Sequence, residues 1–119
     1  MGLDQFAYSV DNTGNKTEIS YWRKHPNLQG WMENLWYKKG CPNAHEDNPS
    51  EFNCVPMTLD YNDLDNLEND IKNKGLPSTD GFFFGDNSNE HYYQQDLEFV
   101  EHARNALDSD LSVVYDSSW

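Results

Sequence analysis

Two extended runs joined by a short polar segment decide the fold: Gln5–Val10 (QFAYSV) and Lys16–Lys24 (KTEISYWRK), with Asp11–Asn15 (DNTGN) between them. Both runs carry β-branched and aromatic residues, which are favoured in strands. The Asp, Asn and Gly residues between them tolerate the positive φ angles that tight turns need. The sequence therefore predicts a β-hairpin.

A helix is predicted directly after this hairpin. Pro26 ends the second strand, and Asn27 is a suitable N-cap. Apolar residues then recur with the spacing of one helical face, at Leu28, Trp31, Met32, Leu35 and Trp36. The segment Lys38–Pro42 (KKGCP) provides basic residues for the negative end of the helix, a glycine for its closing turn and a proline that prevents continuation.

The rest of the chain alternates between strand and helix patterns. Residues 54–59 predict a short strand, which Pro56 would confine to a sheet edge or a bulge. A helix is predicted from about Asn62 and a buried strand at 81–85. A third helix is predicted from Asn87 or Ser88, followed by a last strand at 111–115. The inward face of this third helix is expected to carry Tyr93, Leu97, Val100, Ala103 and Leu107.

These patterns predict the α+β class. We expect a small, mostly antiparallel sheet of about five strands, with about three helices packed on one face. The chain has 119 residues and no linker that would divide it, so residues 1–119 are expected to form a single domain. Four Trp, seven Tyr and six Phe exceed what so small a core requires, which predicts that some aromatic side chains lie at the surface.

The net charge of −13 is unevenly distributed. Residues 1–40 hold five basic and four acidic side chains, whereas the remainder holds three basic and 17 acidic ones. Such a surface repels the phosphates of nucleic acids, which argues against direct nucleic-acid binding. The simpler explanation of the acidity is solubility, and the alternative is a surface that imitates nucleic acid.

The chain does not open with the pattern of a secretory leader, and no apolar run approaches about 18 residues. We therefore expect a cytoplasmic protein that does not contact a membrane. Cys41 and Cys54 are too few for a disulfide framework and are expected to remain thiols.

Five short motifs occur together in a fixed order. They are Met1–Asp4 (MGLD), Tyr21–Lys24 (YWRK), Leu76–Pro77 leading to Gly81–Gly85 (GFFFG), Tyr92–Tyr93 before Asp96–Leu97, and Ser118–Trp119. In this order they resemble a family of small proteins encoded mainly by tailed bacteriophages and prophages, which typically open Met-Gly-Leu-Asp-Met-Tyr. The resemblance implies phage origin and action inside a bacterial host cell. It implies no established activity.

The strongest candidate site is the start of the first helix. Unpaired N–H groups and the helix dipole combine there with Arg23, Lys24 and His25 to favour an anion, such as a phosphate or carboxylate group. Tyr21 and Trp22 could stack on a ring of the same ligand, and Asn27 lies at the helix start. The alternative is that Arg23 and Lys24 pair with carboxylates of their own domain.

Other candidate chemistry is weaker. Cys41, His45 and Cys54 could bind zinc, but they lack the close paired spacing of zinc modules. The acidic run around Asp63 lacks the glycine of an EF-hand loop. No nucleophile elbow, phosphate-binding glycine loop or metalloprotease pair is present, so the sequence favours a protein that is not an enzyme. We expect no metal and no cofactor.

Two hypotheses of function follow. The first is an interaction module that binds a host or phage protein, or a second copy of itself as a homodimer, through an aromatic patch. The second is a protein or enzyme that binds an anionic or nucleotide-like small molecule at the Arg23–Lys24 helix start. A virion component or assembly factor is a third possibility that composition leaves open.

Overall fold

The computed structural model describes residues 3–47, 52, 54–73 and 88–118. Its elements, in chain order, are β1 (Asp4–Val10), β2 (Lys16–Arg23), α1 (Pro26–Lys38), β3 (Met57–Leu59), α2 (Tyr61–Lys72), α3 (Ser88–Asp108) and β4 (Ser112–Ser118). The predicted α+β class is confirmed. The described sheet has four strands rather than about five, and the strand predicted at 81–85 lies outside the described residues.

The sheet is antiparallel throughout, with the order β2-β1-β4-β3. The predicted hairpin is confirmed as β1 and β2, and its turn depends on Asp11, whose Oδ1 accepts from the backbone N–H groups of Thr13 and Asn15 at 2.9 Å each. Gly14 adopts a φ of 89°, which favours glycine. β3 is the edge strand that Pro56 predicted.

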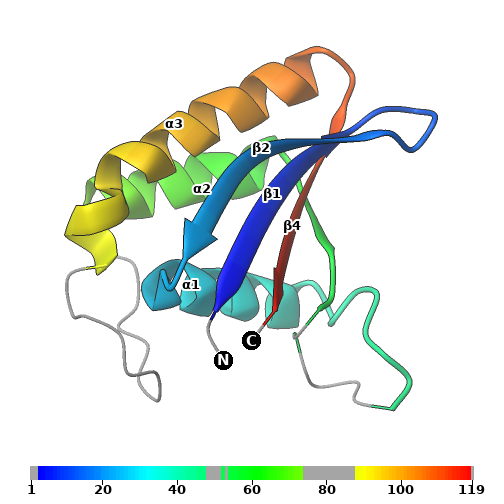
Figure 1. Ribbon diagram of the computed structural model, residues 1–119, viewed down its shortest axis with the longest axis horizontal. Helices are drawn as coiled ribbons and strands as arrows, with labels where there is room; N and C mark the ends of the chain where they lie inside the picture. Colours follow the sequence, from blue (N-terminus) through cyan, green and yellow to red (C-terminus); the bar gives the residue numbers. More distant parts are fainter. Residues whose placement is uncertain (1–2, 48–51, 53, 74–87, 119) are drawn as a thin grey trace.

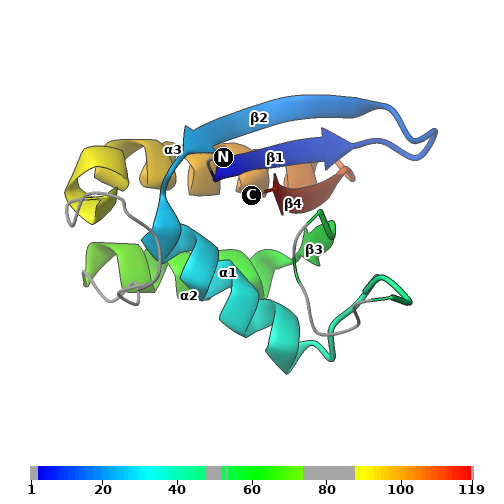
Figure 2. The same cartoon turned by 60° about the horizontal axis from the view of Figure 1, so that its bottom comes forward.

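The three helices lie to one side of the sheet, and none of the described helices covers its other face (Figures 1 and 2). This one-sided packing explains the alternation in β1, where Gln5, Ala7 and Ser9 are buried and the residues between them are half-buried. The face of the sheet opposite the helices is called the outer face below.

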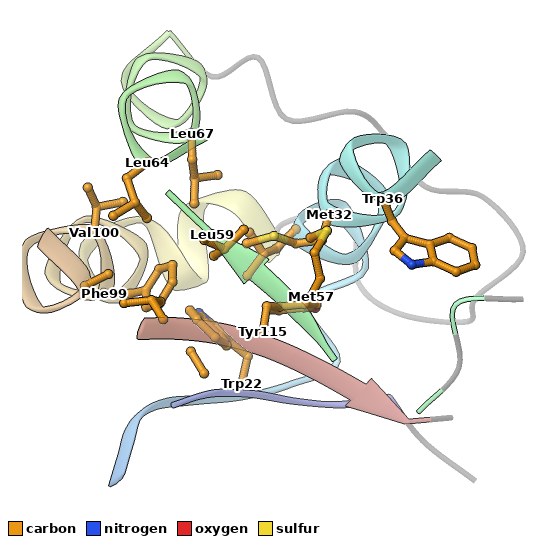
Figure 3. Close-up of a cluster of buried hydrophobic side chains, with 14 of the residues drawn as sticks. Trp22, Met32, Trp36, Met57, Leu59, Leu64, Leu67, Phe99, Val100 and Tyr115 are labelled. Atoms are coloured by element: carbon orange, nitrogen blue, oxygen red, sulfur yellow. The ribbon is translucent and has the colours of Figure 1, made fainter. Parts of the chain in front are cut away.

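The core joins the inner face of the sheet to the helices through large aromatic side chains (Figure 3). Trp22 of β2 contacts Phe99 of α3 edge-on, with ring centroids 5.1 Å apart. Trp36 of α1 stacks on Phe52, and Phe52 stacks on Tyr115 of β4. These rings fill the space beneath a small sheet, because each aromatic side chain buries about 150–250 Å².

The structure corrects two helix predictions. α1 begins at Pro26 with His25 as its N-cap, whereas Asn27 was predicted to be the cap; proline suits the first helical position because it has no N–H to leave unpaired. On α3, Tyr93 is 37% exposed, which contradicts its predicted inward position, and the inward face also includes the buried Asp96 and Phe99. Leu97 and Leu107 are half-buried and pack against the core, as predicted. Val100 and Ala103 face inward as predicted.

β4 extends to Ser118, beyond the predicted end at Tyr115. Its last residues pair with the beginning of β1, where Asp4 lies opposite Ser118 and Phe6 lies opposite Asp116. The acidic and polar sequence of Asp116–Ser118 gave no strand signal, because its extended form is stabilised by β1 rather than by its own side chains.

Candidate functional site

The segment between β2 and α1 changes direction at Lys24. Lys24 has a φ of 61°, and its N–H donates to the carbonyl oxygen of Leu3 at 2.8 Å. This left-handed conformation is uncommon for a lysine. It ends the strand and carries the next residue, His25, into the interior, where its side chain has 0% exposure.

His25 is held by Asp96 of α3. Its Nε2 lies 2.8 Å from Asp96 Oδ2, and the other carboxylate oxygen of Asp96 accepts from Trp22 Nε1, also at 2.8 Å. Both Asp96 and Trp22 are buried. Burial raises the pKa of Asp96, while His25 and Trp22 oppose that rise by bonding to the charged form. An internal carboxylate therefore lies beside the N-cap residue of α1, where the helix dipole favours negative charge.

The ring of Tyr92 lies against His25. Their ring centroids are 4.7 Å apart with an interplanar angle of 24°. The hydroxyl of Tyr92 donates to the carbonyl oxygen of Arg23. Tyr92 thus connects α3 to the end of β2 and covers the imidazole ring.

A second set of polar side chains extends from His25 through the core. Gln5 Oε1 accepts from the backbone N–H of His25 at 2.8 Å, and Gln5 Nε2 donates to the His25 carbonyl oxygen at 3.1 Å and to the Tyr115 hydroxyl at 2.9 Å. The Tyr115 hydroxyl donates in turn to Gln29 Oε1 at 2.6 Å. Burial raises the pKa of Tyr115 far above its ordinary value, so its hydroxyl keeps its proton.

The six residues predicted for a ligand site occupy different environments. Trp22 and His25 meet in the interior at Asp96. Tyr21, Arg23 and Lys24 are exposed, and Asn27 is half-buried in the first turn of α1. Tyr21 lies on the outer face, where its hydroxyl donates to Asp4 at 2.8 Å. Among the described residues, no carboxylate lies within ion-pair distance of the Arg23 guanidinium.

Sequence reasoning gave no buried polar role to the network residues Gln5, Gln29, Asp96 and Tyr115, nor a role to the half-buried Tyr92 that covers His25. One local signal was present. Gln5 shares the inward phase of β1 with Ala7, and a polar residue at an inward strand position indicates a buried partner. Asp96 gave no comparable signal, because an acid beside an apolar stripe is usually solvent-exposed.

The outer face carries three aromatic side chains in contact. Phe6 lies between the other two, with ring-centroid distances of 6.0 Å to Tyr8 and 5.0 Å to Tyr21. We call Phe6, Tyr8 and Tyr21 the aromatic row. The ammonium group of Lys16 lies 5.5 Å from the centroid of the Tyr8 ring, a cation–π distance.

Carboxylates surround the aromatic row. Glu18 of β2 pairs in register with Tyr8, and Asp116 of β4 pairs with Phe6. Partial burial raises the pKa of Tyr8, and the negative charges of Glu18 and Asp116 raise it further. Burial also raises the pKa of Asp116, and the positive charge of Lys16 is among the effects that oppose this. The row is therefore an apolar surface in a negative field.

A groove of about 420 Å³ lies between α2 and α3. The lining residue Arg104 pairs with two carboxylates of α2, with distances from Nη2 of 2.6 Å to Asp65 and 3.0 Å to Glu68. The hydrogen bond that Arg104 donates to Glu68 lowers the pKa of the Glu68 carboxyl group. These contacts connect the two helices, so Arg104 and Glu68 have a structural role in the groove.

Within the described part of the chain, no three His, Cys, Asp or Glu side chains gather as metal ligands would, and no helix is long and apolar enough to cross a membrane. Cys41 is half-buried and Cys54 is exposed. The chain matches no protein-family model, no curated protein and no solved structure.

Proposed function

We propose that this protein is an interaction module that binds a positively charged segment of a partner protein through the outer face of its sheet. In keeping with the phage resemblance, its place of action would be the cytoplasm of an infected bacterial cell, and the partner a host or phage protein. The observation that carries the proposal is the aromatic row bordered by Glu18 and Asp116 on a sheet face that no described helix covers.

Charge supports a basic partner. The chain has a net charge of −13, and the row already places an ammonium group, that of Lys16, above an aromatic ring. Lysine and arginine side chains of a partner could make the same contact, while the carboxylates guide their approach. Phosphate groups would meet repulsion on this face, so a nucleic acid is a poor ligand for it.

Aromatic side chains on a flat sheet also suit the energetics of protein recognition. Tyrosine offers large contact area with little conformational entropy to lose, which is why it is frequent among residues that dominate binding energy. Tyr21 is 40% exposed and is already oriented by its hydrogen bond to Asp4. A partner would therefore meet a row that is partly pre-organised.

The test compares affinity isolation by three tagged proteins from lysates of phage-infected bacteria. They are the wild type, a Phe6→Thr/Tyr8→Thr variant, and a Tyr37→Thr variant that removes an exposed tyrosine of α1 away from the sheet. Threonine keeps the strand propensity at positions 6 and 8 of β1. Circular dichroism checks that each variant folds. We expect a stoichiometric partner rich in lysine and arginine, held equally by the wild type and Tyr37→Thr. Its affinity should fall about 30-fold for the row variant and further with added salt.

Other results would replace the proposal. A partner that the row variant holds as tightly as the wild type would show that another surface binds it, and an acidic partner would contradict the charge argument. A dimer that dissociates in the row variant would assign the face to self-association. A retained anionic small molecule without a protein partner would favour the second candidate, a ligand site at Arg23 and Lys24, for which the exposure of both side chains is the supporting observation.

A further inference from the structure

The buried polar network determines how the amide of Gln29 is oriented. The Tyr115 hydroxyl has one proton and already accepts a hydrogen bond from Gln5 Nε2, so it donates its own proton to Gln29 Oε1. The amide nitrogen of Gln29 must then point elsewhere. It is buried, with the residue 2% exposed, and it has no hydrogen-bond partner among the described residues.

Asp96 determines the state of His25 in the same way. One oxygen of its carboxylate accepts from Trp22 and the other faces His25 Nε2, an arrangement that places a proton on Nε2. His25 Nδ1 is buried and has no described partner. With the ring proton on Nε2, Nδ1 carries a lone pair and is a hydrogen-bond acceptor.

Three buried polar side-chain atoms of the described residues have no partner: His25 Nδ1, Gln29 Nε2 and Ser117 Oγ. The first two are complementary. Gln29 Nε2 donates and His25 Nδ1 accepts, yet they are not bonded to each other. The residues are one helical turn apart and are joined by a backbone hydrogen bond of 3.1 Å from Gln29 N to His25 O. The backbone of His25 bonds to Gln5, and the side chain of Gln29 bonds to Tyr115, so one network connects the two residues. Leaving a buried polar atom without a partner destabilises the folded state, so the pair favours an occupant.

We propose that the interior of this protein binds one hydroxyl group, from a water molecule or a small molecule, between His25 Nδ1 and Gln29 Nε2. A hydroxyl oxygen accepts from the Gln29 amide while its proton goes to the imidazole. Tyr92 covers the imidazole ring of this site, held by its hydrogen bond to the Arg23 carbonyl. This site is separate from the aromatic row and does not depend on the proposed interaction with a partner protein.

The test is nitrogen NMR of the full chain labelled with ¹⁵N-histidine at neutral pH. We expect His25 to carry its proton on Nε2 and to show the shift of a hydrogen-bonded acceptor at Nδ1. His102, which is exposed on α3, serves as the internal reference. A protonated Nδ1, or an Nδ1 with the shift of a non-bonded acceptor, would overturn the proposal on the wild-type protein alone.

A variant then tests the contribution of Gln29. Gln29→Met keeps a side chain of similar length but has no amide, so the His25 Nδ1 signal should move to the position of a non-bonded acceptor while the Nε2–Asp96 bond is retained. An unchanged Nδ1 signal in a folded Gln29→Met protein would contradict the bridge.

Native mass spectrometry and magnetisation transfer from solvent then identify the molecule that supplies the hydroxyl group. A small molecule would add mass in native mass spectrometry and be released on denaturation. Water would leave the mass of the bare chain and give magnetisation transfer from bulk solvent to the His25 ring. Either result supports the site, because both supply the same hydroxyl chemistry.

Discussion

Tyr21 and Trp22 are neighbours on β2, and their side chains point to opposite faces of the sheet. Each donates a hydrogen bond of 2.8 Å to an aspartate on its own face. Tyr21 bonds to Asp4 on the outer face, and Trp22 bonds to Asp96 in the core. The bond lengths are equal, but the surroundings differ. Water can replace Asp4 as an acceptor, whereas nothing replaces Asp96 in the interior. The comparison teaches that burial, rather than bond length, decides what such a bond contributes to stability.

The largest expected effect is at Asp96. Asp96→Ala removes the acceptor of both Trp22 and His25 and leaves two buried N–H groups unpaired, which should lower the free energy of unfolding by about 3–5 kcal/mol. The matched control Asp4→Ala should cost less than about 0.5 kcal/mol, because its partner hydroxyl turns to water. Urea unfolding followed by circular dichroism measures both. Equal costs would contradict the comparison.

The next effect concerns the donors. Trp22→Phe removes the indole N–H and part of a ring that packs against Phe99, so we expect a loss of about 2–3 kcal/mol. Tyr21→Phe removes only an exposed hydroxyl and should change stability by less than about 0.5 kcal/mol. The same unfolding experiment applies. If Tyr21→Phe proved as costly as Trp22→Phe, the outer face would be more tightly coupled to folding than its exposure indicates.

The smallest effect is on pH dependence. Burial raises the pKa of Asp96 in the folded state. The folded state therefore holds the carboxyl proton of Asp96 more tightly than the unfolded chain does, where the pKa of an aspartate is about 3.9. The resulting contribution to stability is complete below that value and is lost as the pH rises through the raised pKa of the folded state. The free energy of unfolding of the wild type, measured relative to that of Asp96→Asn, should therefore fall as the pH increases from about 4.

Glu68 provides a control of opposite sign. Its pKa is lowered, chiefly by its hydrogen bond to Arg104, so its contribution is present above the ordinary pKa of glutamate and is lost as the pH falls. The difference between the wild type and Glu68→Gln should accordingly decline toward acid pH. Urea titrations across the acidic range measure both slopes, and slopes of the same sign would show that one of the two environments is misassigned.

Local sequence patterns predicted much of the fold. The hairpin, the inward stripe of α1, the placement of α2 and the edge position of β3 all follow from spacing, turn residues and proline, which act within a few residues of the chain. The inward face of α3 was predicted only in part, because Tyr93 is exposed and the buried Asp96 and Phe99 were not expected there. Its true phase depends on Asp96, whose partners Trp22 and His25 are 74 and 71 residues away.

The candidate sites divide in the same way. The sequence by itself determined that Tyr21 and Trp22 lie on a strand and that Arg23–His25 precedes a helix, because the preferences of the backbone are local. Only the tertiary structure decided that Trp22 faces the core, that His25 meets Asp96, and that Gln5, Tyr115 and Gln29 form one network. A buried polar group is stable only where a partner from another element reaches it, and that depends on how the whole chain packs.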